Sequence, residues 1–309
     1  MTKHRTILIA GPTASGKSAL ALSLAEHLGT AVIINADSMQ VYADLRVLTA
    51  RPTVEDEQRV RHALIGHVSG SEAYSAARFV VECAAALTDA HARGETALIV
   101  GGTGLYFKAL LEGLSPIPPI PEEVRAHVRA KALRLGAAAL HDELSACDPV
   151  MAARLVPTDT QRITRALEVL EATGQSLSYW QQIPGVPVID PAGARHLVIQ
   201  PERGDMMARC DQRFDLMIRH GALEEVAQLR EAQLPADVPI MRALGVRPII
   251  DYLDGVVTLE RATELAKTET RQFAKRQITW LKRHMITWKC VETQEIEQNI
   301  REIISFIDF

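Results

Sequence analysis

The eight-residue string GPTASGKS at positions 11–18 constrains the fold of this chain more than any other part of the sequence. Its pattern is G-x-x-x-x-G-K-S, and it lies between a short apolar run at 6–10 and a helical pattern at 17–28. In that setting the glycines let backbone N–H groups turn toward phosphate oxygens, and the helix N-terminus adds positive potential. The string therefore predicts a phosphate-binding loop, called the 11–18 loop below, at the start of an α/β domain.

Two residues of the 11–18 loop have distinct predicted roles. Lys17 supplies a mobile cation, and the Ser18 hydroxyl is a candidate ligand for Mg²⁺. The loop as a whole is the predicted phosphate site, and its members are Gly11, Pro12, Thr13, Ala14, Ser15, Gly16, Lys17 and Ser18. This pattern does not say which phosphate compound binds.

The rest of the chain alternates short β-branched runs with helical stretches. Strands are predicted at 7–10, 31–34, 97–100 and 195–200, and helices at 17–28, 77–91 and 104–112, with a mostly helical chain from 203 onward. Strands that alternate with helices are typical of a parallel sheet. The predicted fold class is α/β, a parallel sheet core flanked by helices.

A proline-rich stretch at 115–121 interrupts this alternation. Helical patterns follow at 122–135, 137–146 and 160–173, and a second Pro/Gly-rich stretch at 183–191 leads back to the strand at 195–200. We therefore predict a helical insertion domain over 116–187 within one α/β core domain formed by 1–115 and 188–309.

Composition excludes several classes. The chain has 309 residues, of which 47% are hydrophobic and 23% charged, so disorder is not indicated. No apolar run approaches the roughly 18 residues that a membrane span needs, and the N-terminal run is too short for a signal peptide, so we expect a cytoplasmic protein. The four cysteines, Cys83, Cys147, Cys210 and Cys290, are widely spaced and are expected to be buried and reduced.

Two strand ends bear on the chemistry. Nucleotide hydrolases with such a loop usually hold Mg²⁺ with an Asp at a later strand end, but the strand at 97–100 is followed by Gly101, Gly102 and Thr103. This argues against an ATPase or GTPase and makes a kinase less favoured. Asp37 follows the second strand, where it could be a general base or the N-cap of a short helix beginning at Ser38. Position alone does not decide between them.

Longer strings identify a family resemblance. GPTASGKS (11–18), NADSMQVY (35–42), YSAARF (74–79), GGTGLYFKALLEGLSP (101–116), QRITRALEVLEATG (161–174) and TRQFAKRQITWLKRH (270–284) occur in this order. Together they resemble the bacterial tRNA dimethylallyltransferases, the isopentenyl-tRNA transferases, over almost the whole chain from Gly11 to about Trp288.

The resemblance implies a reaction. The dimethylallyl group of dimethylallyl diphosphate would pass to N6 of adenine 37, beside the anticodon, in tRNAs that read codons beginning with U. The 11–18 loop, Arg213 and Mg²⁺ would hold the diphosphate, Asp37 would be the general base, and Thr103 would lie beside the reaction channel. The family also implies a monomer, with the insertion domain receiving the tRNA anticodon stem-loop.

The resemblance also implies a set of tRNA contacts from six parts of the chain. They are Asp37, Ser38, Met39, Gln40 and Thr103; Arg125; Gln161, Arg162, Ile163, Thr164 and Arg165; Arg242, Gly245 and Arg247; and Lys275, Arg276, Gln277, Ile278, Thr279, Trp280, Leu281 and Lys282.

The residues themselves do not decide whether the chain has an RNA-binding surface. The segment 271–284 carries five Lys or Arg residues and no acid, with Ile278 and Leu281 expected to face the core, but such runs are usually solvated surface. Arg162 and Arg165 could instead pair with Asp159 or Glu168. Three tryptophans, Trp180, Trp280 and Trp288, and three histidines, His62, His67 and His141, are predicted to be structural.

Three other functions stay open on the sequence. They are an adenylate isopentenyltransferase acting on free AMP, a small-molecule kinase, and, more remotely, a non-enzymatic RNA-binding protein. The string Leu48-Thr49-Ala50-Arg51-Pro52 departs from the Gly-Thr-Ala-Lys-Pro usual in the family, which leaves the substrate contacts of that segment undefined.

Overall fold

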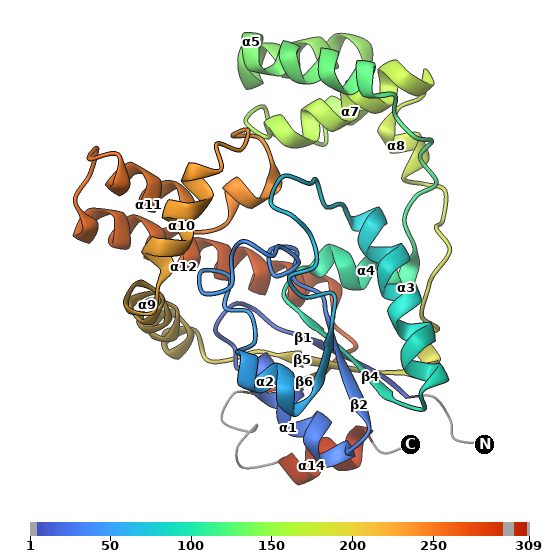
Figure 1. Cartoon of the computed structure of the whole chain (residues 1–309). Helices are drawn as coiled ribbons and strands as arrows, with labels where there is room; N and C mark the ends of the chain where they lie inside the picture. Colours follow the sequence, from blue (N-terminus) through green and yellow to red (C-terminus); the bar gives the residue numbers. More distant parts are fainter. Residues whose placement is uncertain (1–4, 293–299, 308–309) are drawn as a thin grey trace. The chain divides into compact units, whose positions relative to one another are not determined.

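The computed structural model describes residues 5–292 and 300–307. A single parallel sheet lies at the centre of the larger of its two compact units, Met1–Leu111 with Val188–Phe309, which is called the main body below (Figure 1). Its six strands run in the order β3-β2-β4-β1-β5-β6. Their bounds are β1 (Thr6–Ala10), β2 (Ala31–Asn35), β3 (Arg61–Ala63), β4 (Thr96–Gly101), β5 (Ala194–Ile199) and β6 (Lys289–Val291). The α/β class and four of the strands are confirmed, whereas the two short edge strands, β3 and β6, were not predicted.

The register of the sheet brings distant loops to one edge. In the centre, Ala10 at the end of β1 pairs with Gly101 of β4 and with Val198 of β5. Asn35 at the end of β2 pairs with Val100 of β4. Because carboxyl ends of parallel strands share an edge, the 11–18 loop, Asp37 and Thr103 emerge side by side.

Helices cover both faces of the sheet. Alternate strand residues face opposite sides, so Ile7 and Ile9 pack with α1 (Lys17–Leu28) and α14 (Ile300–Ile307), while Leu8 and Ala10 pack with α3 (Ala76–Ala92) and α4 (Gly104–Glu112). Helix α1 has the predicted bounds, because Gly16 and Gly29 flank it in conformations that suit glycine. A short helix, α2 (Val54–Arg59), precedes β3.

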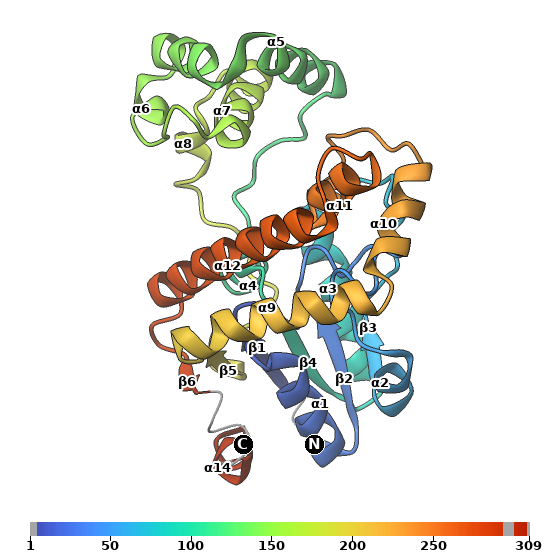
Figure 2. The same ribbon diagram turned by 90° about the vertical axis from the view of Figure 1, so that its left-hand side faces the viewer.

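The last third of the chain forms a helical layer with its own core (Figure 2). It contains α9 (Arg203–Arg219), α10 (Ala222–Glu231), the 3₁₀ turn η2 (Pro239–Arg242), α11 (Val246–Leu253) and the long α12 (Leu259–His284). Another 3₁₀ turn, η1 (Pro191–Gly193), lies just before β5. Phe214 and Val226 pack there against Val41 and Leu45 from the segment after Asp37. The helical layer therefore supports one of the loops at the strand ends.

Residues Glu112–Pro187 form a second compact unit, separate from the unit made by Met1–Leu111 and Val188–Phe309. It contains α5 (Glu122–Cys147), α6 (Pro149–Ala152), α7 (Thr160–Thr173) and α8 (Leu177–Trp180) around Val128, Leu140 and Ile163. Gly136, at φ 76° and ψ 171°, interrupts α5 between the two helices that the sequence predicts.

Two composition-based expectations meet different outcomes. Among the described residues, no helix has the length and apolar character needed to cross a membrane. All four cysteines are free thiols, but only Cys83 and Cys210 are buried, so the expectation of burial was wrong for Cys147 and Cys290. Cys147 is the last residue of α5 and Cys290 lies on the edge strand β6, and both places leave side chains open to solvent.

Candidate active site

The 11–18 loop makes a tight turn between β1 and α1. The Gly11 N–H donates to the Gly101 carbonyl at 3.2 Å, and a Cβ on Gly11 would lie 2.6 Å from Ser15 Oγ. Ala14 (φ 61°) and Gly16 (φ 86°) both adopt left-handed backbone, which turns the loop into α1. Within residues 5–292, no side chain caps the start of α1 and no acid lies in its first turn. The N–H groups there are suited to an anion.

Two cations interact at this loop, Lys17 of the loop itself and Arg213. Burial lowers the pKa of Lys17 from its ordinary value to about 8; the charge of Asp37 opposes the shift and that of Arg213 adds to it. Burial also lowers the pKa of Arg213, which comes from α9. Lys17 Nζ donates to the Pro12 carbonyl at 3.2 Å. Two partly desolvated cations with one nearby carboxylate form an electrostatic site for a multiply charged anion.

Asp37 is held by a turn at the end of β2. The buried Asn35 accepts from the Asp37 N–H at 2.9 Å, and its Nδ2 donates to the carbonyls of Asp37 and Leu64. Asp37 Oδ1 accepts from the Met39 N–H at 2.9 Å. No helix begins at Ser38 in the described chain, so the helix-capping alternative is wrong: Asp37 stabilises a turn with one oxygen. Asn35 is a supporting residue that the sequence analysis missed, although it lies in the NADS string.

Thr103 connects the ends of β2 and β4. Its Oγ1 accepts from the Ser38 N–H at 3.0 Å, and its own N–H donates to the Ala36 carbonyl at 3.3 Å. A Cβ on Gly101 would collide with the Ala36 backbone. The two loops therefore approach as closely as glycine allows, and the structure brings Asp37, Thr103, Lys17 and Arg213 to one edge of the sheet.

The residues around Ser18 fit Mg²⁺ only in part. Ser18 lies at the start of α1 and is exposed. Among the described residues, no group of three or more His, Cys, Asp or Glu side chains could hold a metal ion. Mg²⁺ is commonly held by one protein oxygen together with substrate phosphates and water, and the Ser18 hydroxyl suits that arrangement.

The segment after Asp37 is held by three side chains, Gln40, Arg51 and Glu225, in roles that the resemblance did not imply. Gln40, predicted as a tRNA contact, donates from Nε2 to the carbonyls of Thr49 and Ala50 at 3.0 and 2.9 Å. Arg51, the departure from the family pattern, donates from Nη1 to the Tyr42 and Ala43 carbonyls. Glu225 of α10 accepts the N–H groups of residues 46, 47 and 48 at 2.7–3.0 Å. Arg51 therefore has a structural role in this chain.

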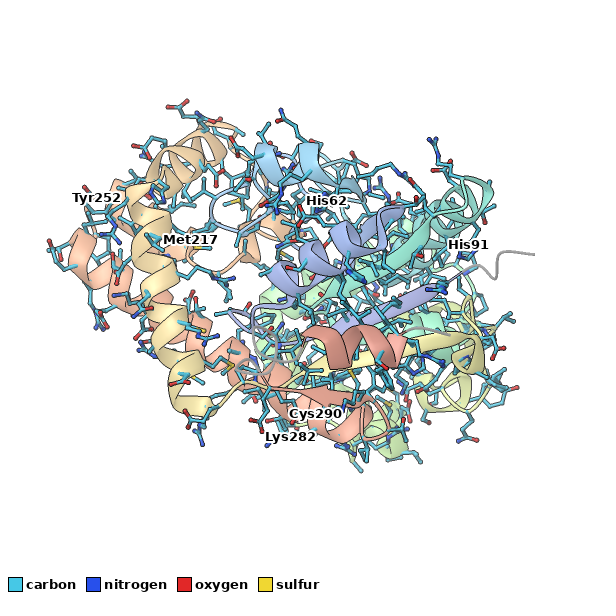
Figure 3. All side chains as sticks on the ribbon, turned by 90° about the horizontal axis from the view of Figure 1, so that it is seen from below. His62, His91, Met217, Tyr252, Lys282 and Cys290 are labelled. Carbon is cyan, nitrogen blue, oxygen red and sulfur yellow. The ribbon has the colours of Figure 1, made fainter. Side chains whose placement is uncertain are left out.

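Helix α12 presents the predicted tRNA contacts on two different faces. Lys275, Arg276, Thr279 and Lys282 are exposed, Ile278 and Trp280 are half-buried, and Gln277 and Leu281 are buried. Figure 3 shows Lys282 on the C-terminal part of the helix. Arg271, counted in the basic run, donates to both carboxylate oxygens of Asp211 on α9 at 2.6 and 2.7 Å. The exposed basic face of α12 is therefore smaller than the run suggested.

The predicted contacts near α11 are arranged differently. Arg242 and Arg247 are exposed, and Arg247 pairs with Asp251 at 2.9 Å on the same helix. Gly245 is buried at the N-cap of α11 with φ 87°, and a Cβ there would lie 2.9 Å from the Phe214 ring. Only the two arginines present side chains to solvent.

In the second unit, the QRITR string is mostly an ion-paired helix surface. Arg162 lies 3.4 Å from Asp159, and Arg165 lies 3.3 Å from the buried carboxylate of Glu168. The pairing alternative raised by the sequence is thus confirmed. The side chains of this set range from exposed to buried: Gln161 and Arg162 are exposed, Thr164, Arg165 and Arg125 are half-buried, and Ile163 is in the core.

The three histidines and Trp288 behave as predicted. His62 and His141 bond to backbone carbonyls, and His67 pairs with Glu82 at 2.8 Å. Figure 3 labels His62 on β3, whose neighbour Arg61 forms an ion pair with Asp89 of α3 at 3.2 Å. Trp288 packs edge-on against Phe107, with ring centroids 5.6 Å apart. These residues are part of the packing and of ordinary ion pairs.

Known proteins place the chain in a family. A family model described as IPP transferase matches residues 40–284. The tRNA dimethylallyltransferase of Parvibaculum lavamentivorans is 52% identical, covering 98% of this chain and 96% of that protein; the one from Azorhizobium caulinodans is 51% identical over 93% and 91%.

Solved structures agree with this assignment. The tRNA isopentenylpyrophosphate transferase of Bacillus halodurans has a TM-score of 0.70 and 32% identity, with 99% of this chain and 97% of that chain covered. A eukaryotic dimethylallyltransferase described as acting on tRNA has a TM-score of 0.80 and 29% identity, with 96% and 75% covered. The chain therefore belongs to the IPP transferase family.

Proposed function

We propose that this chain is a tRNA dimethylallyltransferase, which transfers the dimethylallyl group of dimethylallyl diphosphate to N6 of adenine 37 in tRNA and releases diphosphate. The observation that carries the proposal is the pair of half-buried cations, Lys17 of the 11–18 loop and Arg213 of α9, whose charges act on each other and on Asp37. Relatives about 50% identical over nearly the whole chain are tRNA dimethylallyltransferases, which supports the same reaction.

The leaving group is the first requirement of this chemistry. Breaking the allylic C–O bond releases diphosphate and leaves a resonance-stabilised cation, so the site has to stabilise the growing negative charge. The N–H groups at the start of α1, the Lys17 ammonium and the Arg213 guanidinium would bind the diphosphate oxygens. Mg²⁺ at the Ser18 hydroxyl would add charge stabilisation there.

The acceptor is the second requirement. The exocyclic amine of adenine is a poor nucleophile, so its proton has to leave as the new C–N bond forms. Asp37 would take that proton with the carboxylate whose Oδ1 already accepts the Met39 N–H. Thr103, fixed to the Ser38 backbone, would line the place where the base enters. Adenine would have to leave the anticodon-loop stack to reach them.

The RNA would be positioned by exposed basic residues. Lys275, Arg276 and Lys282 on α12, with Arg242 and Arg247 near α11, are the side chains in a position to contact phosphates. We further propose that the second unit, Glu112–Pro187, receives the anticodon stem-loop, that the enzyme works as a monomer, and that it acts in the cytoplasm.

The deciding experiment uses the purified protein, Mg²⁺, dimethylallyl diphosphate labelled in the prenyl group, and a choice of acceptor. Unmodified tRNA carrying adenine 37 should become labelled, while the same tRNA with guanine at that position serves as the matched control. Label in AMP alone would favour an adenylate isopentenyltransferase. ATP consumption with a small-molecule acceptor and no prenyl transfer would favour a kinase.

A further inference from the structure

Gln277 is a buried amide in the C-terminal half of the basic helix α12. Its side chain is only 7% exposed and lies on the inward face of α12 with Ala274 and Leu281. A buried amide needs hydrogen-bond partners for both its oxygen and its nitrogen. Both partners come from the loops at the strand ends: Oε1 accepts from the Thr13 N–H at 2.8 Å, and Nε2 donates to the Gly102 carbonyl at 2.9 Å.

These two contacts join the two halves of the candidate site. Thr13 belongs to the 11–18 loop, on the side of the leaving group. Gly102 precedes Thr103, which bonds to the Ser38 backbone next to Asp37 on the side of the acceptor. A Cβ on Gly102 would collide with Gln277 Nε2 and lie 3.2 Å from the Gly11 carbonyl oxygen. One side chain therefore spans the space between the leaving-group loop and the acceptor loop.

A second contact from the same helix supports the 11–18 loop. Ala14 holds a positive φ of 61°, an unusual conformation for a residue with a Cβ, which persists only when its surroundings fix it. It packs against a small cluster formed by Met206, Cys210 and Ala274, with Ile278 beside it. Helix α12 thus contacts Thr13 through Gln277, and it contributes Ala274 to the cluster against which Ala14 packs.

We propose that Gln277 is a positioning residue for the transfer reaction and not an RNA contact. It holds the 11–18 loop and the turn at Gly102 in one geometry, so that the diphosphate and the Asp37 carboxylate keep the separation that bond formation needs. The inference rests on the proposed function, because it assigns the two loops to leaving group and acceptor. A misplacement of about 1 Å at such a site can lower a rate about 100-fold.

Two substitutions at this position separate the contacts. Gln277→Leu removes both hydrogen bonds at similar volume. Gln277→Glu keeps an oxygen for the Thr13 N–H but places the other against the Gly102 carbonyl. The matched control is Thr270→Val: Thr270 is also buried on α12, and its hydroxyl bonds only within the helix, to the Ala266 carbonyl at 2.8 Å.

The measurements are dissociation constants for inorganic pyrophosphate with Mg²⁺ and for tRNA, the transfer rate at saturating substrates, and amide hydrogen exchange over residues 11–18. For Gln277→Leu we expect pyrophosphate binding weakened about 10-fold, a transfer rate lowered about 10- to 100-fold, and faster exchange at Thr13. Its tRNA affinity should stay within about twofold of the unsubstituted protein. Gln277→Glu should also lower the transfer rate, because the contact with Gly102 is lost, but should protect the Thr13 N–H better than Gln277→Leu does. Thr270→Val should leave all four measurements unchanged.

Other outcomes would overturn the inference. Weaker tRNA binding with unchanged pyrophosphate binding would make Gln277 an RNA contact, and an equal loss in Thr270→Val would attribute the effect to burial on α12. Full transfer rate with normal exchange at Thr13 would remove the positioning role. If the unsubstituted protein bound no pyrophosphate and transferred no prenyl group, the proposed function would fail instead.

Discussion

At the scale of single residues, Lys17 is the group whose ionisation should be visible in ligand binding. Its pKa is lowered to about 8 by burial, while a bound diphosphate would stabilise the ammonium and raise that pKa. The affinity for dimethylallyl diphosphate should then be highest and constant below about pH 8. It should fall as the pH rises above that value, by up to roughly tenfold per pH unit. The measurement is the dissociation constant of dimethylallyl diphosphate at fixed free Mg²⁺ without tRNA, between pH 7 and about 9.5.

Lys17→Met provides the control for this titration. It should bind the diphosphate more weakly at neutral pH and lose the decline above pH 8, because the titrating ammonium is gone. Arg213, whose charge persists throughout the range, should keep some binding in that variant. A decline of the same steepness in Lys17→Met would assign the titration to another group.

Asp37 can be tested with an isosteric change. In Asp37→Asn, the amide oxygen can still accept the Met39 N–H, so the turn is kept while the base is lost. The transfer rate should fall about 10²- to 10⁴-fold. Pyrophosphate should bind at least as tightly as before, because a negative charge near Lys17 and Arg213 is removed. Single-turnover transfer and pyrophosphate titration measure the two effects, and an undiminished rate would exclude Asp37 as the base.

The Gln277 result shows what sequence strings can and cannot give at this scale. The resemblance implied that Gln277 contacts tRNA, whereas its buried amide bonds to the Thr13 N–H and the Gly102 carbonyl. A signal was available: positions 274, 277 and 281 have the i, i+3, i+7 spacing of one helix face. The partners of the amide could not be predicted, because Thr13 and Gly102 lie far away in sequence and meet it only through the fold.

At the scale of elements, α10 holds the loop that follows Asp37. The Glu225 carboxylate accepts three backbone N–H groups, from residues 46 to 48. Glu225→Gln keeps one acceptor oxygen but points an NH₂ group at a remaining donor, which should weaken the loop by about 1–3 kcal/mol. Faster amide exchange at 46–48 and a lower thermal midpoint are expected. Glu224→Gln, on the exposed side of the same helix, should change neither quantity. If the amides of residues 46–48 exchanged as slowly in Glu225→Gln as in the unsubstituted protein, Glu225 would not hold this loop.

Elements with clear boundary residues were the ones that the sequence predicted well. Helix α1 was predicted at its observed bounds because Gly16 and Gly29 flank it, and the break in α5 falls at Gly136 as expected. The strands β3 and β6 were missed since each has only three residues and lies at a sheet edge. Such strands carry no periodic pattern; their pairing with β2 and β5 creates them.

At the scale of the whole molecule, a net charge of −4 coexists with a basic face on α12. If that face binds RNA phosphates, the logarithm of tRNA affinity should fall linearly with the logarithm of salt concentration. Lys275→Ala combined with Lys282→Ala should reduce the magnitude of that slope by about 2. The exposed Arg93 lies just before β4, at the amino ends of the strands, whereas the 11–18 loop lies at their carboxyl ends. Arg93→Ala should therefore leave the slope unchanged. An unaltered slope in the double variant would move the RNA face elsewhere.

The main body closes on itself where the second unit is inserted. The Leu110 carbonyl accepts the N–H groups of both Val188 and Ile189, at 2.9 and 3.0 Å. The chain thus leaves and re-enters the main body at a single seam. Replacing residues 114–184 by a linker of about six residues should give a protein that folds and binds pyrophosphate but has lost most of its tRNA affinity. Because both crossings lie at one place, the second unit could be replaced by another without rebuilding the sheet or its anion site. The specificity for the acceptor could then change independently of diphosphate binding.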